Sequence, residues 1–185
     1  MKKEMNILLI VSAFFMLAGG LFGPIYAIFV EHIGGDLVTA GTAYSIYYIL
    51  AGILIYVVSK FEDRMNNQEF LIVIGYFINS VGYLGYLYIS EPLHLYVVQM
   101  IFGIGAAVNV PAFKGVFSHN LDRGKFDSEW GLWDGMSYFF WGVSAFIGGY
   151  IAKIYGFEIL FFIMLCLSVI GLIISTRLFF IKKRK

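Results

Sequence analysis

Charged residues divide this chain into six long uncharged windows, and this spacing limits the possible folds more than any other feature. The windows span residues 5–30, 37–59, 70–90, 92–113, 135–152 and 159–176. Each is about 18 to 26 residues long, and an α-helix needs about 20 predominantly apolar residues to cross the hydrocarbon core of a bilayer. We therefore predict an all-α, polytopic membrane protein with six transmembrane helices in a single domain over residues 1–185.

The composition also favours a chain surrounded by lipid. Of its 185 residues, 60% are hydrophobic and 14% are charged, whereas a typical soluble domain has about 25% charged residues. The net charge of +1 provides no basic field for nucleic acid, so no nucleic-acid partner is expected. The single cysteine, Cys166, excludes a disulfide within the chain and is expected to be a small core residue.

The distribution of Lys and Arg predicts the orientation. If the spans alternate in direction, nearly all the basic residues lie on the same side as both chain ends. This set comprises Lys2, Lys3, Lys60, Arg64, Lys114, Arg123, Lys125, Arg177 and the basic tail at 182–185. Lys153 lies on the other side. The positive-inside rule then predicts a plasma-membrane protein with both termini in the cytoplasm.

A weak internal repeat divides the chain into two units of three spans, residues 1–90 and 91–185. A shift of 87 residues places Pro24 on Pro111 and Phe70 on Phe157. Three spans followed by three spans make the second unit inverted relative to the first. Helices interrupted by Gly or Pro at corresponding positions of two repeats point to the binding site of a transporter.

Residues 99–115 form an apolar run that carries Gln99, Asn109 and Lys114 and contains Gly103, Gly105 and Pro111. Gly and Pro weaken a helix in water, but in a bilayer neighbouring helices and polar side chains can satisfy the freed backbone groups, so we expect a weakened helix that bends around a cavity. Gln99 and Asn109 are candidate solute contacts because a buried amide needs hydrogen-bond partners. Interhelical hydrogen bonding is the alternative for both.

Two charge pairs are candidates for a cytoplasmic gate. Lys114 lies about one turn before the end of the fourth predicted helix and Asp134 about one turn into the fifth, so an ion pair between them is expected. In the alternative, the Lys114 side chain extends to the interface and Asp134 faces the loop. Asp63 and Arg64 form the second pair, with a solvated loop pair as its alternative.

Other chemistry has little support in the sequence. His32, His94 and His119 have no metal-ligand spacing, so no metal or other cofactor is expected. We find no nucleophile–base constellation and predict that the chain is not an enzyme. No ATP-binding element or mid-membrane carboxylate is present, which argues against an ATP-driven pump and against a proton relay within one subunit.

Three motifs resemble those of major facilitator superfamily transporters. Gln99-x-x-x-Gly103-x-Gly105 followed by Pro111 resembles the fourth helix of that family, where an Arg commonly occupies the position of Gln99. The loop at 59–68 is similar to the family pattern Gly-x-x-x-Asp-Arg-x-Gly-x-Arg/Lys. Its Asp63 and Arg64 match, whereas Ser59, Asn66 and Gln68 depart from the pattern. Residues 146–157 resemble the passage from the fifth helix to the sixth.

The resemblance covers nearly the whole chain and implies one half of the usual twelve-span fold. It implies that the first and fourth helices line a cavity and that the second and fifth contact the other half. The resulting hypothesis is alternating-access transport of a small solute by a homodimer, or by this chain with another six-span half. The solute would bind near Gly23, Pro24, Tyr44, Tyr47, Gln99, Asn109 and Trp141. The alternative is a non-transporting membrane scaffold or accessory subunit.

Overall fold

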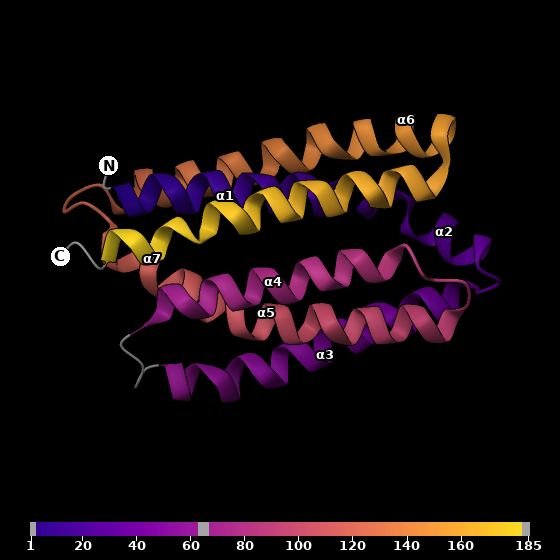
Figure 1. The fold of residues 1–185 in the computed structure, drawn as a ribbon, viewed down its shortest axis with the longest axis horizontal. Coiled ribbons are helices and arrows are strands. Elements are labelled where there is room, and N and C mark those ends of the chain that lie inside the picture. The colour runs from indigo at the N-terminus through magenta and orange to yellow at the C-terminus, as the bar shows by residue number, and fades with distance from the viewer. Residues whose placement is uncertain (1–2, 63–66, 183–185) are drawn as a thin grey trace.

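The computed structural model describes residues 3–62 and 67–182, and within these residues every regular element is a helix. The helices lie roughly parallel or antiparallel along the long axis of the molecule (Figure 1). In chain order they are α1 (Lys3–Gly20), η1 (Gly23–Ile25), α2 (Tyr26–His32), α3 (Leu37–Glu62), α4 (Gln68–Tyr86), α5 (Pro92–Asn120), α6 (Phe126–Ser175) and α7 (Arg177–Lys182).

Five helical segments of the described residues are long and apolar enough to cross a membrane, where the sequence predicts six. The difference lies in α6, which is 50 residues long and at 1.5 Å per residue would extend about 75 Å if straight. Gly156 within it has φ 81° and ψ 175°, a conformation open to glycine because it has no Cβ. Figure 1 shows α6 turning back at its far end, so residues 126–155 form an outgoing arm and residues 157–175 a returning arm.

Proline and glycine act differently in the first and fourth predicted helices. The first is interrupted, because α1 ends at Gly20 and a 3-10 turn that contains Pro24 separates it from α2. The fourth, α5, continues through Pro111, so this run of glycines and proline is retained within one helix, as expected for a bilayer. Its glycines bring helices together instead. A Cβ on Gly103 would lie 3.2 Å from the Tyr47 carbonyl oxygen, and one on Gly105 would overlap the Asn79 side chain.

Two groups of helices make the most extensive contacts: α1 packs on α6, and α5 packs between α3 and α4. The contact of α1 with α6 is especially close, because a Cβ on Gly148 would overlap the carbonyl oxygen of Leu21. Two separate apolar clusters hold the bundle together. One includes Phe22 and Phe161, and the other, towards the chain ends, includes Leu8 and Phe117.

The outer surfaces of α3 and α6 are largely uncovered. Only 11% of the apolar window of α3 is buried. The sequence predicts that the last helix faces lipid, but one face of the returning arm, with Met164, Ser168 and Gly171, is buried against the rest of the bundle. Cys166 lies on the opposite, exposed face, so the prediction of a core cysteine is wrong.

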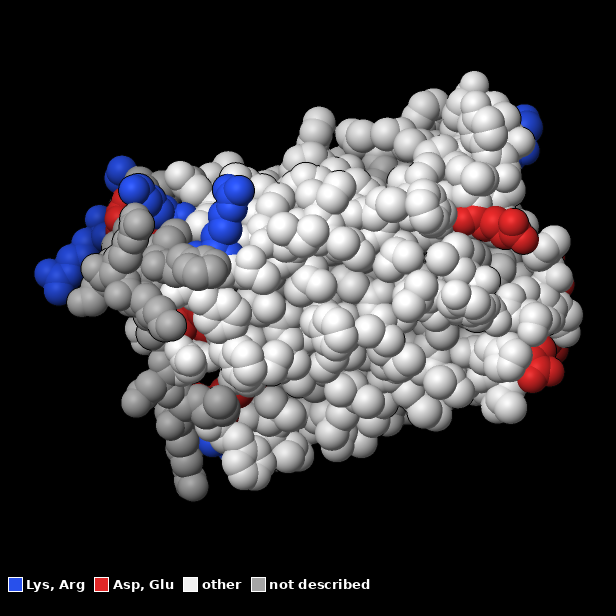
Figure 2. Space-filling model, in the orientation of Figure 1, with Lys and Arg blue, Asp and Glu red and all other residues white. Residues whose placement is uncertain are grey.

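Charged residues gather at the two ends of the bundle. Both chain ends lie at one end, which is rich in Lys and Arg, while acidic side chains dominate the visible part of the other end (Figures 1 and 2). The broad middle of the visible face carries almost no charge. This band agrees with a bilayer-spanning bundle, and the uneven charge agrees with the asymmetry found in the sequence.

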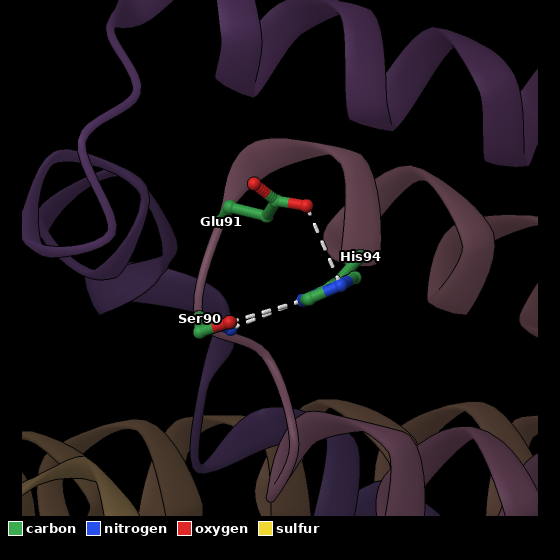
Figure 3. A network of polar contacts seen from close by, with 3 residues as sticks. All are labelled: Ser90, Glu91 and His94. Carbon is green, nitrogen blue, oxygen red and sulfur yellow. Dashed lines mark hydrogen bonds and ion pairs between the residues drawn. The ribbon is translucent and has the colours of Figure 1, made fainter.

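A small polar network starts α5 at the end away from the chain termini (Figure 3). The Ser90 backbone N–H donates to Nδ1 of His94 at 3.4 Å, while Nε2 of His94 lies 3.5 Å from a carboxylate oxygen of Glu91. Pro92 occupies the first turn of the helix, where its missing N–H and fixed φ are well tolerated. His94 thus has a role at the helix start, and the described residues contain no cluster of metal-ligating side chains.

Candidate functional site

A cavity of about 530 Å³ lies within the bundle. Residues of α1, η1, α2, α3, α4, α5 and α6 line it. Its volume falls in the range of typical small-molecule sites, roughly 300–1,000 Å³. Thirteen of its 24 lining residues are aromatic, so flat ring surfaces form most of the wall. Amides and hydroxyl groups supply most of the polar remainder.

The cavity brings together most of the residues that the sequence singles out. Those that line it are Gly23, Tyr44, Tyr47, Gln99, Asn109, Lys114 and Trp141. Pro24 is exposed and Asp134 is also exposed, and neither belongs to the lining. Asp63 and Arg64 lie outside the described residues. The part each lining residue plays in binding remains a prediction.

Gln99 joins three helices at the cavity wall. Its side chain is 6% exposed, and its Nε2 donates to the hydroxyl oxygens of Tyr26 on α2 at 3.1 Å and Tyr86 on α4 at 3.3 Å. Because both hydroxyl oxygens accept from Gln99, their own protons remain available to donate. The interhelical hydrogen bonds considered as an alternative are therefore present, and they coexist with a position on the cavity.

Asn109 has a similar double position nearer the chain ends. Its Nδ2 donates to the Ile72 carbonyl oxygen of α4 at 3.1 Å, so it too makes an interhelical hydrogen bond. Gly75 permits this approach, since a Cβ there would lie 2.9 Å from the Asn109 backbone nitrogen. The amide fixes α4 against α5 and also contributes to the lining.

Aromatic residues of α3 and α6 complete the more open part of the wall. The Tyr44 ring meets that of Tyr26 edge-on, with centroids 4.6 Å apart, and Tyr47 meets Tyr48 in the same way at 4.7 Å. On α6, Trp141 packs beside the glycines that end α1 and begin η1. Tyr44, Tyr48 and Trp141 remain 39%, 63% and 47% exposed, so this side of the cavity is incompletely covered.

The predicted ion pair between Lys114 and Asp134 is not formed in this structure, where no salt bridge within the described residues joins them. Lys114 is exposed and contributes to the cavity lining instead. Trp133 also lines the cavity, and its indole N–H is buried and has no hydrogen-bond acceptor within the described residues. The gate therefore stays a prediction about another conformation.

Comparison with known proteins identifies the family. Residues 8–185 match the Major Facilitator Superfamily. The chain belongs to that superfamily. This membership confirms the resemblance seen in the three motifs and places the chain among multi-pass membrane transporters, which agrees with the prediction that it is not an enzyme.

Individual relatives support the same assignment. The chain is 26% identical over 176 residues to the uncharacterized MFS-type transporter MJ1560 of Methanocaldococcus jannaschii, covering 94% of this chain and 45% of that protein. It is 25% identical over 150 residues to the uncharacterized MFS-type transporter YitZ of Bacillus subtilis, covering 78% of this chain and 88% of YitZ. It is 28% identical over 176 residues to the quinolone resistance protein NorB of Staphylococcus aureus, covering 92% of this chain and 36% of NorB. The chain thus spans less than half the length of two of these relatives.

One face of α4 contributes to this cavity, which the sequence interpretation missed. Tyr76, Asn79, Tyr83 and Tyr86 all line the cavity. They follow the spacing i, i+3, i+7 and i+10, which places side chains on one side of an α-helix. That regular spacing is a usable signal, but tyrosines are so common near membrane interfaces that the spacing alone does not separate cavity residues from the aromatic belts.

Proposed function

We propose that this chain forms one half of a transporter that moves a small solute across the plasma membrane by alternating access. The two arms of α6 would cross the bilayer separately, giving six spans in a 3+3 inverted repeat with both termini in the cytoplasm. The charge asymmetry between the two ends of the bundle supports this orientation. Family membership supports transport over a purely structural role.

The observation that carries the proposal is the cavity itself. Its wall places the amides of Gln99 and Asn109 beside aromatic rings inside a bundle that is otherwise suited to lipid. A scaffold could use both amides simply to join helices, as they do here; what favours a solute site is that they also border a cavity of small-molecule size, where such groups can fix a solute's orientation. We infer that the solute binds in this cavity.

A second copy of the chain is the proposed complement. The helices that flank the less covered side of the cavity, α3 and the outgoing arm of α6, carry large exposed side chains such as Tyr48, Tyr138 and Phe146. Two subunits related by a two-fold axis along the membrane normal would enclose one shared cavity between these helices. Another six-span half, in the same or a different chain, would fill the same position.

Water access to the cavity tests the transport proposal against the scaffold alternative. Asn109→Cys in a Cys166→Ala background would be exposed to a small, membrane-impermeant maleimide from each side of sealed vesicles. A transporter should label at this position from one side, and a stabilising solute found by a thermal-shift screen should change the labelled side or block labelling. Phe77→Cys, on an exposed part of α4, is the matched lipid-facing control. Absence of labelling at residue 109 from both sides would contradict the proposal.

The oligomer is tested by crosslinking in native membranes. In the same background, Gly142→Cys on the outgoing arm of α6 should give a disulfide-linked or bis-maleimide-linked dimer. Ile173→Cys, 62% exposed on the returning arm, should give little. Equal crosslinking at both positions, or transport by a species that remains monomeric in mild detergent, would overturn the homodimer.

The gate is a separate part of the proposal. If Lys114 and Asp134 pair when the cytoplasmic side closes, neutralising either residue should reduce transport, and exchanging the two should restore it. Because the ion pair would form in one conformation only, the exchange should leave the thermal stability nearly unchanged. If the exchange failed to restore transport, Lys114 and Asp134 would not form the gate.

A further inference from the structure

We propose that the cavity selects aromatic molecules that carry a negative charge, with Lys114 as the counter-ion. This inference rests on the proposed function, since it treats the cavity as the solute site. It goes further by naming the chemistry of the solute. Three properties of the lining lead to it: its charge, its ring surfaces and the direction of its hydrogen bonds.

The charge of the lining is one-sided. Among the described residues that border the cavity, Lys114 alone is charged, and no Asp or Glu borders it. Lys114 forms no ion pair with a described carboxylate, and the nearby Asp134 is outside the lining. A cation in this space would meet an ammonium group without a compensating carboxylate. An anion would gain a charge-assisted hydrogen bond, the stronger class of hydrogen bond.

The rings nearest Lys114 in the chain favour a flat solute. Phe113, which precedes it in α5, and Trp133 of α6 both line the cavity, with ring centroids 5.8 Å apart at an interplanar angle of 40°. Aromatic pairs favour offset or edge-to-face contacts, so a solute ring can add to this cluster while an attached carboxylate reaches Lys114. A purely aliphatic anion would satisfy the charge but lose these contacts.

Two tyrosine hydroxyls at the Gln99 end of the cavity can donate hydrogen bonds to a solute. Tyr26 and Tyr86 accept from Gln99, which leaves both hydroxyl protons to donate. Gln99 and Lys114 are 15 positions apart in α5, about 22 Å along a helix. A solute of one or two rings held at Lys114 does not span this distance, so the tyrosine hydroxyls can serve only a longer solute that carries a second acceptor group, such as a carbonyl.

Aromatic walls also attract cations, so a cationic aromatic solute is the main competitor. A cation placed over a Tyr or Trp face gains a favourable interaction with the ring. In this cavity that gain is opposed by the positive charge of Lys114. The test should therefore vary the charge of the solute while keeping its aromatic ring the same.

Four probes separate charge from ring surface: 2-naphthoate, 2-naphthylmethanol, a 2-naphthyl trimethylammonium salt and octanoate. Binding is measured by isothermal titration calorimetry on the purified protein in nanodiscs, with empty nanodiscs subtracted. We expect 2-naphthoate to bind about tenfold more tightly than the alcohol and than octanoate. The ammonium probe should bind most weakly of the three naphthalenes.

Variants at Lys114 then assign the preference. Lys114→Gln should abolish the advantage of 2-naphthoate over the alcohol while leaving alcohol binding within about twofold, which also reports a folded cavity. Lys114→Arg should retain the advantage, and Lys114→Glu should shift the preference to the ammonium probe. Lys153→Gln, which removes a Lys outside the cavity lining, should behave as the parent protein.

The outcomes distinguish this inference from the proposed function. Equal or tighter binding of the ammonium probe, or a 2-naphthoate preference that survives Lys114→Gln, would overturn the inference even if another solute is transported. Selective, Lys114-dependent binding without flux of any solute into proteoliposomes would support the inference and count against transport.

Discussion

The outgoing arm of α6 carries glycines on two faces that differ completely in their surroundings. On one face, a Cβ at Gly148 would overlap the Leu21 carbonyl oxygen of the α1 end. On the other, a Cβ at Gly135, Gly142 or Gly149 would have none of the described atoms within 4 Å. Glycine therefore allows close helix packing at Gly148, whereas the other three glycines lie on an exposed face that no described residue covers.

The second helix that flanks the cavity repeats this contrast. Where α3 meets α5, the Tyr47 carbonyl oxygen and the Leu50 side chain lie against Gly103. Along the rest of α3, Gly41 and Gly52 have open space among the described residues. Small residues at lipid-exposed positions allow another helix to approach closely. The packed glycines hold the bundle together, and the open ones are where the second half that we propose could approach.

The strongest way to break this comparison is to add a side chain at two adjacent positions of α6. Gly148→Val should destabilise the protein by at least about 3 kcal/mol or prevent folding, because the new atoms overlap backbone that cannot move aside easily. Gly149→Val, one residue away, should fold normally because its Cβ enters open space. Thermal unfolding in detergent, followed by size-exclusion chromatography, measures both. Similar melting temperatures for the two variants would refute the packing assignment.

A smaller effect is expected from the polar link inside the packed region. Gln99→Leu removes the hydrogen bonds to Tyr26 and Tyr86 and leaves two buried hydroxyl groups without that partner. The expected loss is about 1–3 kcal/mol of unfolding free energy. Met100→Leu, at the next and more exposed position of α5, is the matched control. An unchanged melting temperature for Gln99→Leu would mean that the hydrogen bonds contribute little.

The sequence predicts the helical segments well because their signal is local. The length of each uncharged window matches the thickness of the bilayer core. Five helical segments of the described residues have the length and apolarity to cross it. The finer details of two helices depend on single backbone positions. Gly156 turns α6 back without a loop, whereas Pro111 leaves α5 uninterrupted. Neither outcome follows from residue type alone, because both depend on which neighbouring helix satisfies or crowds the backbone.

The cavity is predicted only in part for a related reason. Gln99 and Asn109 stand out in an apolar sequence, and the structure places both on the cavity wall. Tyr26 and Tyr86 do not stand out, because tyrosine is frequent in membrane helices and their contact with Gln99 joins residues 73 and 13 positions apart. Cys166 was misplaced because an apolar helix is equally apolar on its packed and lipid-facing sides, so the pattern does not tell the two apart.

The open glycines give a prediction that affects assembly more than stability. Gly142→Leu should change the unfolding free energy of the subunit by less than about 0.5 kcal/mol, since its surroundings are empty. If a second half packs there, the same change should reduce the crosslinked dimer several-fold. The measurement pairs thermal unfolding with bis-maleimide crosslinking from a neighbouring engineered cysteine. Undiminished crosslinking would indicate that this face contacts lipid.

The smallest predicted effect lies at the start of α3, outside the membrane band, where a fully exposed carboxylate caps the helix. An Asp36 oxygen accepts from the Thr39 backbone N–H at 2.7 Å and from the Thr39 hydroxyl at 2.8 Å, and these bonds lower the pKa of Asp36 below its usual value. A carboxylate with a lowered folded-state pKa stabilises the protein above the unfolded-state pKa, about 4, and this contribution is lost as pH falls through the folded-state value. Asp36→Ala should therefore lower the melting temperature slightly at pH 7, and the difference from the parent should shrink below about pH 4. A difference that persists unchanged at low pH would show that the Asp36 side chain stabilises α3 through something other than its charge.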